Sequence, residues 1–193
     1  MNDIEKIMIK RTEIMIEKYN FVKKLSFPEP KLIQIDNIQD YTVGKFKDDF
    51  SKLGDNIIYI IMTNEIPYTY KSIKEKFEEL KKRSKKNYHI SKINDEILWN
   101  RVTEEKIIYV GSKENNAINR FQQHFGIDIN SRETYSLYLK DWWPNNMKLM
   151  IKLYQFGSKI TSDILQIIED LMWDEYLPLF GKKGATFNKK IKL

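Results

Sequence analysis

The chain has 193 residues, of which 41% are hydrophobic, and a formal net charge of +6. This length favours one domain, and the apolar share is enough for a sizeable core. The lack of cysteine excludes disulfides, thiol catalysis and cysteine-ligated zinc, and a chain with 2 histidines has no multi-histidine metal site. A catalytic metal would therefore be held mainly by carboxylates and water, which favours Mg²⁺.

Charge and the N-terminal residues indicate the class of partner and the compartment. A positive balance suits an anionic partner, and nucleic acid is the commonest one. Asp3 and Glu5 lie near the N-terminus with no apolar segment beside them, so we expect no signal peptide. No apolar run reaches membrane-spanning length. The expectation is a cytoplasmic protein with no membrane partner.

The N-terminal part predicts a long helix and a buried strand. From residue 3 to about 20, isoleucine and methionine recur at helical spacing among lysine and glutamate, which indicates an amphipathic helix. The prolines within residues 26–30 end this helix. Residues 31–55 predict a loop with a short helix or strand. The apolar, β-branched run 56–62 predicts a buried strand.

A helix with a capping box is expected next. Ser72 and Glu75 have the spacing of this motif, and the apolar side chains that follow extend the helix to about residue 85. The polar stretch 87–105 predicts a loop with a short strand at 97–99.

Strands and helices alternate in the rest of the chain. We expect a strand at 106–110, a helix capped near Asn116 and ending near 125, a short helix or extended segment at 137–143, a strand at 147–156, and a helix from Thr161 or Ser162 to 177. This order predicts an α/β (α+β) fold: a small, mixed, mainly antiparallel three-stranded sheet flanked by helices. The expected division is an N-terminal helical extension over 1–55 and a folded domain over 56–193, with an insertion at 63–105.

The stretch that suggests chemistry is 107–125, IIYVGSKENNAINRFQQHF. A β-branched run leads into Tyr109 and Gly111, and the helix that follows carries Arg120 and His124. Positions i and i+4 share one helix face, so a guanidinium and an imidazole gather beside a glycine turn and a phenol. These groups suit the binding and cleavage of a phosphodiester.

At this point the chain resembles the GIY-YIG nuclease family. Ile57-Ile58-Tyr59 stands where the family has Gly-Ile-Tyr, and Tyr109-Val110-Gly111 stands where it has Tyr-Ile-Gly. Arg120 and His124 match the Arg and His of the next helix. Glu169, upstream of Pro178, matches the carboxylate that binds the metal. The match covers roughly residues 56–181.

Three departures separate the chain from most members of that family. Ile57 replaces the first glycine, and Gly181 stands where many members have asparagine. Gly111 and Arg120 are one residue further apart than usual. The long stretch between Tyr59 and Tyr109 replaces a short hairpin, which resembles the restriction-endonuclease-like members.

The resemblance implies one-metal hydrolysis of DNA, with Mg²⁺ or Mn²⁺ as the cofactor. Glu169 would hold the metal, and Arg120 would bind the phosphate. Tyr59 would orient or deprotonate the attacking water, if the metal and Arg120 lower its pKa. His124 would act as a base or as an electrostatic contact, and Tyr109 would contact the phosphate or support the metal-bound water. The implied role is restriction or host defence.

Basic and aromatic side chains outside this motif are candidates for nucleic-acid contacts. A cluster that includes Lys81 and Lys82 suits phosphates, but it equally suits the C-terminal end of a helix. Trp142 and Trp143 are candidates for base stacking, although core packing is expected for at least one. The full set expected to contact the nucleic acid is Lys81, Lys82, Lys113, Arg120, Lys182 and Lys183.

Two other classes of protein remain open at this stage. Taken singly, Tyr59 reads as a core residue of a buried strand. A catalytically inactive nucleic-acid-binding protein on the same scaffold would fit the replaced Gly and Asn positions. A protein-interaction domain would use the amphipathic N-terminal helix as an oligomer seam. The partner expected under the nuclease reading is double-stranded DNA, and a homodimer would suit a palindromic target.

Overall fold

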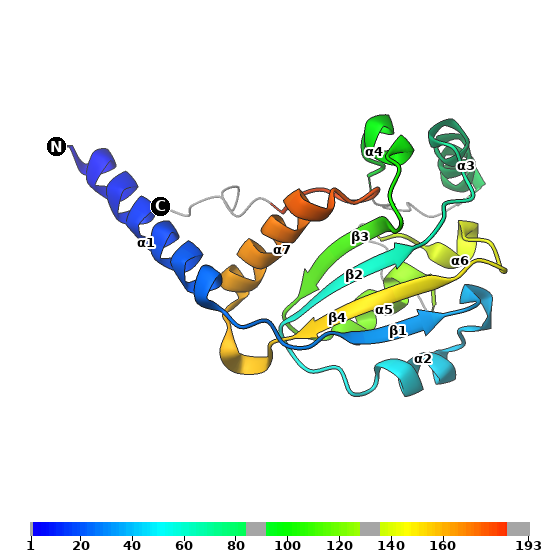
Figure 1. The fold of residues 1–193 in the computed structure, drawn as a ribbon, viewed down its shortest axis with the longest axis horizontal. Coiled ribbons are helices and arrows are strands. Elements are labelled where there is room, and N and C mark those ends of the chain that lie inside the picture. Colours follow the sequence, from blue (N-terminus) through cyan, green and yellow to red (C-terminus); the bar gives the residue numbers. More distant parts are fainter. Residues whose placement is uncertain (1, 84–91, 128–135, 185–193) are drawn as a thin grey trace.

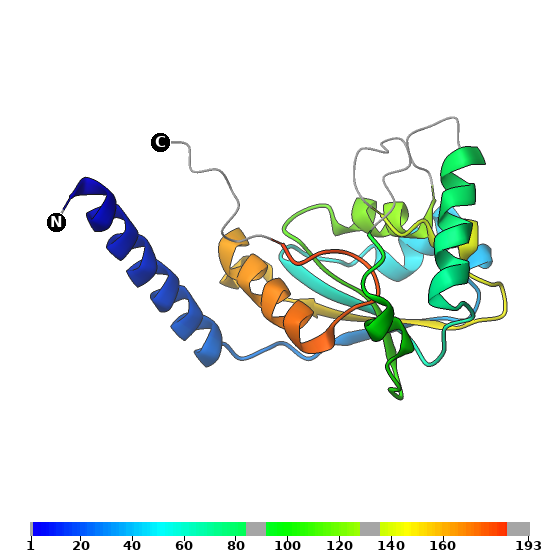
Figure 2. The same cartoon turned by 90° about the horizontal axis from the view of Figure 1, so that it is seen from above.

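The computed structural model describes residues 2–83, 92–127 and 136–184, which form one antiparallel sheet with helices on both faces (Figures 1 and 2). The strands are β1 (Lys31–Ile35), β2 (Ile57–Thr63), β3 (Lys106–Lys113) and β4 (Leu149–Gln155). Their order across the sheet is β1-β4-β2-β3. The α+β class and the three expected strands are confirmed, and β1 is an additional fourth strand.

The described part of the chain has seven α-helices in addition to this sheet. They are α1 (Asp3–Lys24), α2 (Val43–Phe50), α3 (Tyr70–Arg83), α4 (Glu96–Asn100), α5 (Ala117–Phe125), α6 (Leu139–Trp142) and α7 (Ser162–Tyr176). Short 3-10 turns lie at Ile38–Asp40 and Gly157–Lys159. Among the described residues, none of these helices has the length and apolar content needed to cross a membrane.

Strand β2 is the centre of the molecule because every one of its side chains is apolar or small and buried on both faces. Tyr59 and Ile61 face the main core with α2, α5 and α6. Ile58 and Ile60 face the opposite side, where α7 packs. A strand that is buried on both faces has apolar residues at successive positions instead of alternating apolar and polar ones. The apolar run in the sequence therefore predicts this strand.

The expected boundary at residue 55 does not separate two units. Ile33 of β1 pairs with Ile151 of β4, and both belong to the main core. Phe50 of α2 packs against Phe121 of α5, with ring centroids 4.9 Å apart. Residues 31–50 are therefore part of the domain, and only α1 stands away from it (Figure 1).

Three local expectations are corrected by side-chain geometry. Residues 97–99 lie in helix α4 rather than a strand, because the Asp95 carboxylate accepts a hydrogen bond from the Ile97 N–H and caps the helix. Helix α3 begins before Ser72, whose N–H donates to Thr69 Oγ1, so Thr69 is the capping residue instead. Asn116 adopts a left-handed conformation and makes no side-chain cap.

Trp142 and Trp143 are core residues, so neither is available for base stacking. Their exposed fractions are 3% and 2%. Each indole N–H donates to a backbone carbonyl, that of Leu137 at 2.7 Å and that of Met147 at 3.0 Å. A buried indole with its donor satisfied is a packing element.

One edge of the sheet is covered by a segment that follows α7. The N–H groups of Leu179 and Phe180 donate to the carbonyls of Ile107 and Ile108 on β3, both at 2.9 Å. On the other side of this segment, the Leu179 carbonyl accepts a hydrogen bond from the Asn94 N–H at 2.9 Å. The first half of the β3 edge is thereby paired with backbone.

Candidate active site

The site begins with two tyrosines and a glycine on neighbouring strands. Tyr59 on β2 lies opposite Gly111 on β3, and the rings of Tyr59 and Tyr109 are nearly parallel with centroids 6.0 Å apart. A Cβ at Gly111 would lie 2.6 Å from Tyr59 Oη. The glycine therefore makes room for the Tyr59 ring to lie across the neighbouring strand.

Helix α5 brings Arg120 and His124 to these rings. Its buried face carries Phe121, His124 and Phe125, and Gly126 ends the helix at φ 79°. A glycine in this left-handed conformation is a common helix terminator. The imidazole of His124 is fully buried, with its centroid 4.6 Å from that of Tyr109.

The hydrogen bonds of His124 define its tautomer. The Leu137 N–H donates to Nδ1 at 3.3 Å, and Nε2 lies 2.8 Å from Tyr59 Oη. Burial, and then the Arg120 charge, lower the pKa of His124 well below its usual range. The ring is therefore neutral, Nδ1 is an acceptor, and Nε2–H donates to the Tyr59 oxygen. Both ring nitrogens of His124 are hydrogen-bonded, so the geometry favours His124 as a polar contact rather than as a general base.

Arg120 is anchored by several groups on one side of the site. Its guanidinium donates to Tyr109 Oη at 3.2 Å, to Ser136 Oγ at 3.0 Å and to Gln123 Oε1 at 3.3 Å. Burial raises the pKa of both tyrosines, and the Arg120 charge opposes this rise without reversing it. Both phenols are thus protonated at neutral pH, and Tyr59 keeps its own O–H as a donor.

Glu169 enters from the opposite face of the sheet, on α7. The Ser112 hydroxyl, next to Gly111 on β3, donates to Glu169 Oε2. Burial raises the pKa of Glu169, and the Ser112 hydrogen bond partly offsets the rise. The neighbouring Asp170 raises this pKa further, whereas Arg120 lowers it.

The five residues come from β2, β3, α5 and α7, and α5 and α7 lie on opposite faces of the sheet (Figure 2). The Arg120 charge lowers the pKa of Glu169, and the Glu169 charge raises the pKa values of Tyr59 and Tyr109. Hydrogen bonds join Tyr59 to His124 and Arg120 to Tyr109, whereas Glu169 reaches the same strand through Ser112.

The lysines expected to contact nucleic acid are divided between two regions. Lys113 ends β3 and is exposed, and Lys182 and Lys183 follow Gly181 near α7. Lys183 pairs with Asp174. Lys81 and Lys82 lie on α3, which carries none of the five site residues, and Lys81 pairs with Glu78 at 2.7 Å. Lys85 and Lys86, two further lysines of this basic cluster, lie outside the described residues.

The two replaced positions of the motif have structural explanations. Ile57 is fully buried in the main core, where a glycine would leave space unfilled. Gly181 has φ 101°, and a Cβ there would lie 3.0 Å from Tyr109 Cε2. The close approach of backbone to this ring, together with the positive φ, explains a glycine where asparagine was expected.

Two supporting residues were not identified from the sequence. Ser112 holds Glu169, and the alternation along β3 does place it on the face opposite Tyr109 and Gly111. Ser136 is fully buried and accepts from Arg120, but no local pattern in the sequence marks it. A partner so far along the chain is found only from the tertiary structure.

The donor set fits a hard divalent cation held by few protein ligands. Among the described residues, no group of three or more His, Cys, Asp or Glu side chains is arranged as a metal cage. Mg²⁺ is commonly bound through one or two carboxylates together with water and substrate phosphates. Glu169, with Asp170 beside it, meets that requirement.

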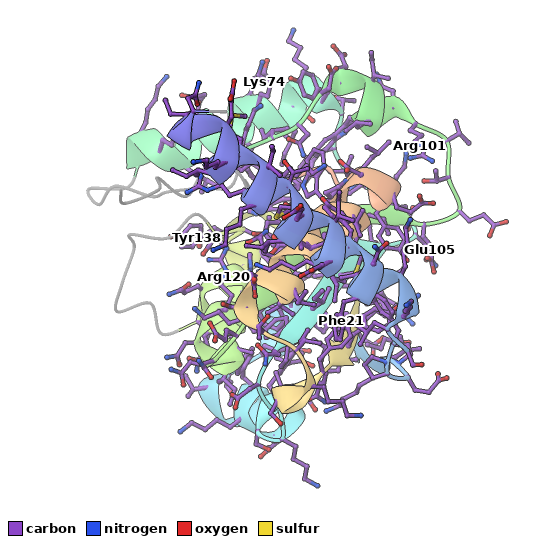
Figure 3. The ribbon with its side chains drawn as sticks, turned by 90° about the vertical axis from the view of Figure 1, so that its left-hand side faces the viewer. Phe21, Lys74, Arg101, Glu105, Arg120 and Tyr138 are labelled. Atoms are coloured by element: carbon purple, nitrogen blue, oxygen red, sulfur yellow. The ribbon has the colours of Figure 1, made fainter. Side chains whose placement is uncertain are left out.

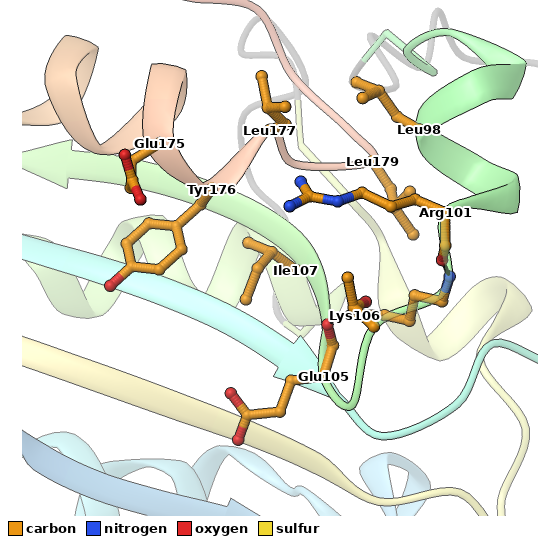
Figure 4. A pocket seen from close by; sticks show the side chains of 10 residues that line it. Leu98, Arg101, Glu105, Lys106, Ile107, Glu175, Tyr176, Leu177 and Leu179 are labelled. Atoms are coloured by element: carbon orange, nitrogen blue, oxygen red, sulfur yellow. Dashed lines mark hydrogen bonds between the residues drawn. The ribbon is translucent and has the colours of Figure 1, made fainter.

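A cavity of about 250 Å³ lies elsewhere, between α4, the start of β3 and the end of α7 (Figure 4). Arg101, Ile107, Tyr176 and Leu179 are among the residues that line it. None of the five site residues does so. The candidate site is thus a cluster of side chains at β3 and does not coincide with this cavity.

Comparison of the chain with protein-family models, curated proteins and solved structures finds no match. The functional argument therefore rests on the geometry of these residues and on the order in which they occur.

We expect acid to destabilise the fold through His124. Unfolded histidine titrates near 6.5, whereas folded His124 resists protonation. The contribution of His124 to the free energy of unfolding is present above about pH 6.5. It is lost as the pH falls, by up to about 1.4 kcal/mol for each pH unit. Glu169 has a raised pKa and therefore the opposite pH dependence. Its contribution to stability is lost as the pH rises above 4.5, the ordinary pKa of a glutamate.

Urea unfolding between pH 7.5 and 5 of the wild type and of His124→Gln separates the two contributions. Both proteins retain Glu169, so the difference between their slopes isolates His124. A smaller loss of stability in acid is expected for the variant. Equal slopes would show that His124 takes up a proton as readily when folded as when unfolded.

Proposed function

We propose that the protein is a metal-dependent endonuclease that hydrolyses phosphodiester bonds in DNA and belongs with the GIY-YIG nucleases. The single observation that supports this most is that Arg120 binds Tyr109 while Glu169 binds Ser112 of the same strand, with Tyr59 opposite Gly111 between them. A guanidinium can stabilise phosphoryl charge, a carboxylate can hold a metal ion, and a phenol can orient the attacking water.

Each residue has a role that follows from its protonation and contacts. Arg120 binds phosphoryl oxygens, since its charge is permanent and its fork is already oriented by Tyr109 and Ser136. Tyr59 would position the attacking water through its O–H, because its oxygen accepts from neutral His124. Tyr109 aligns Arg120 in the site.

Glu169 would hold Mg²⁺ or Mn²⁺, whose charge stabilises the phosphoryl oxygens when bound. Deprotonation of this carboxyl is required for metal binding, and burial works against it. Metal affinity is therefore expected to increase with pH. Ser112 orients the carboxylate before the metal arrives.

The proposed substrate is double-stranded DNA in the cytoplasm, and the proposed role is restriction or host defence. Lys113, Lys182 and Lys183 lie on segments next to the site and suit contacts with phosphates. Lys81 and Lys82 on α3 would extend this contact. A homodimer would supply one site for each strand of a palindromic target.

Incubation of supercoiled plasmid with the protein, with Mg²⁺ or with a chelator, tests the proposal. Cleavage that requires the metal is expected. Binding that weakens steeply with salt, without cleavage, would indicate the inactive nucleic-acid-binding protein instead. No binding at low salt and no cleavage would favour a protein-interaction domain.

A further inference from the structure

The carboxylate of Glu169 contacts an oxygen atom that comes from the sheet. Ser112 Oγ on β3 donates a hydrogen bond to Glu169 Oε2 on α7. Both residues are half-buried, so a hydrated ion can reach this pair of oxygens from solvent. Because α7 packs on β3, two elements of the folded domain hold the pair in place. A hydroxyl oxygen and a carboxylate oxygen therefore lie side by side.

A serine hydroxyl is a suitable ligand for a hard divalent cation. Its oxygen has two lone pairs, and the Ser or Thr hydroxyl of a P-loop binds Mg²⁺ in this way. Ligand oxygens lie about 2.0–2.1 Å from Mg²⁺ in an octahedron, which places adjacent ligands roughly 2.9 Å apart. Hydrogen-bonded oxygens have a similar separation, roughly 2.5–3.0 Å. A hydroxyl that contacts a carboxylate can therefore become its neighbour in a coordination shell with little movement of either side chain.

Other groups near Glu169, within the described residues, are less suitable as a second ligand. Asp170 is the next residue, but successive residues of a helix point about 100° apart. Its Oδ1 atom accepts a hydrogen bond from Gln166 Nε2 at 3.1 Å. Arg120, labelled in Figure 3, is a permanent cation and repels a metal ion. Both ring nitrogens of His124 are hydrogen-bonded. The strand hydroxyl is therefore the most suitable second ligand.

We propose that Ser112 Oγ is the second protein ligand of the divalent cation, beside Glu169. This assignment rests on the proposed metal-dependent function and deepens it, because it names a residue that sets metal affinity and metal preference. In the metal-bound protein, the hydroxyl proton turns away from Glu169, and both oxygens direct lone pairs to the ion. Water and phosphate oxygens complete the octahedron.

The number of water molecules on bound Mn²⁺ tests this assignment without any cleavage reaction. Electron–nuclear double resonance in oxygen-labelled water counts these ligands on the paramagnetic ion. We expect Ser112→Ala to bind Mn²⁺ at least about tenfold more weakly than the wild type and to carry one additional water on the ion. Ser112→Thr keeps the hydroxyl and should retain the affinity and the water count of the wild type.

A role limited to orienting the carboxylate gives a different result. Ser112→Ala would then bind Mn²⁺ more weakly with the same number of waters, and this outcome would overturn the assignment. Failure of the wild type to bind Mn²⁺ would overturn it as well.

The absence of cysteine from the chain allows a second test with a sulfur ligand. Ser112→Cys places one thiol beside Glu169, and a thiolate that binds Co²⁺ gives a sulfur-to-metal charge-transfer absorption. We expect this absorption for Ser112→Cys and its loss in Ser112→Cys/Glu169→Gln. The matched control is Ser51→Cys, which places a thiol at the exposed C-cap of α2 and should give no such absorption. Co²⁺ binding to Ser112→Cys without the absorption would contradict the assignment.

These measurements separate the metal ligand from the nuclease function. Mn²⁺ bound through Ser112 in a protein that does not cut DNA would support the assignment and reject the nuclease. Metal-dependent cleavage, with an unchanged water count in Ser112→Ala, would support the nuclease and reject the assignment.

Discussion

Replacing Glu169 with glutamine is expected to lower Mg²⁺-dependent plasmid cleavage by about 100- to 1,000-fold. The variant keeps the shape of the side chain and an oxygen that accepts from Ser112, but it loses the charge that would bind the metal. Removal of one preorganised electrostatic group commonly lowers a rate by about 100- to 1,000-fold. The measurement is the initial rate of nicking at saturating protein.

The control for this prediction lies on the same helix. Glu175 is exposed near the end of α7, so Glu175→Gln removes the same charge away from the site and should cut as the parent does. Arg120→Lys retains the charge but not the planar fork, and it is expected to cut at least about 100-fold more slowly. If both site variants cut at the parental rate, the assigned site is wrong.

Replacing Gly111 with alanine is expected to destabilise the fold by about 1–3 kcal/mol and to disrupt cleavage. The added methyl would lie 2.6 Å from Tyr59 Oη and 2.7 Å from Tyr109 Cε1. Tyr59 has no space to withdraw, because it is fully buried and its ring packs against Phe121 with centroids 4.6 Å apart. Urea denaturation gives the loss of stability.

Gly44→Ala is the comparison for this prediction. At that position the nearest atom to a new Cβ is Thr42 Oγ1 at 3.8 Å, and the residue lies in the first turn of α2. Alanine in a helix is favoured over glycine by roughly 0.5–1 kcal/mol, so this variant should be as stable as the wild type or more stable. Equal stability of the two alanine variants would mean that the strands separate easily at Gly111.

The parts of the fold that were predictable have strong local patterns. Strand β2 is a continuous apolar run buried on both faces, and β4 alternates apolar and polar residues. Strand β1 was left open as a short helix or strand, because Ile33 and Ile35 are its only buried side chains and the neighbouring Leu32 is 57% exposed. The 97–99 region read as a strand because Ile97 and its neighbours are apolar, yet Ile97 is 77% exposed in a capped helix.

The candidate site was predictable to the extent that its residues form an ordered motif. Tyr109 and Arg120 occur within one strand–helix unit, so their proximity follows from local structure. The part played by His124 did not follow, because its tautomer depends on the Leu137 N–H and on burial. Ser136 was equally hidden, since only tertiary packing brings it to Arg120.

The backbone pairing of Leu179 and Phe180 with β3 has a consequence for solubility. These residues occupy hydrogen-bonding groups of an edge strand that would otherwise accept a strand from another molecule. Proteolytic removal of the chain after α7 would uncover the Ile107 and Ile108 carbonyls beside a site at the same strand. A truncated protein should therefore aggregate through this edge. The segment beside the candidate site thus also protects the edge strand from pairing with other molecules.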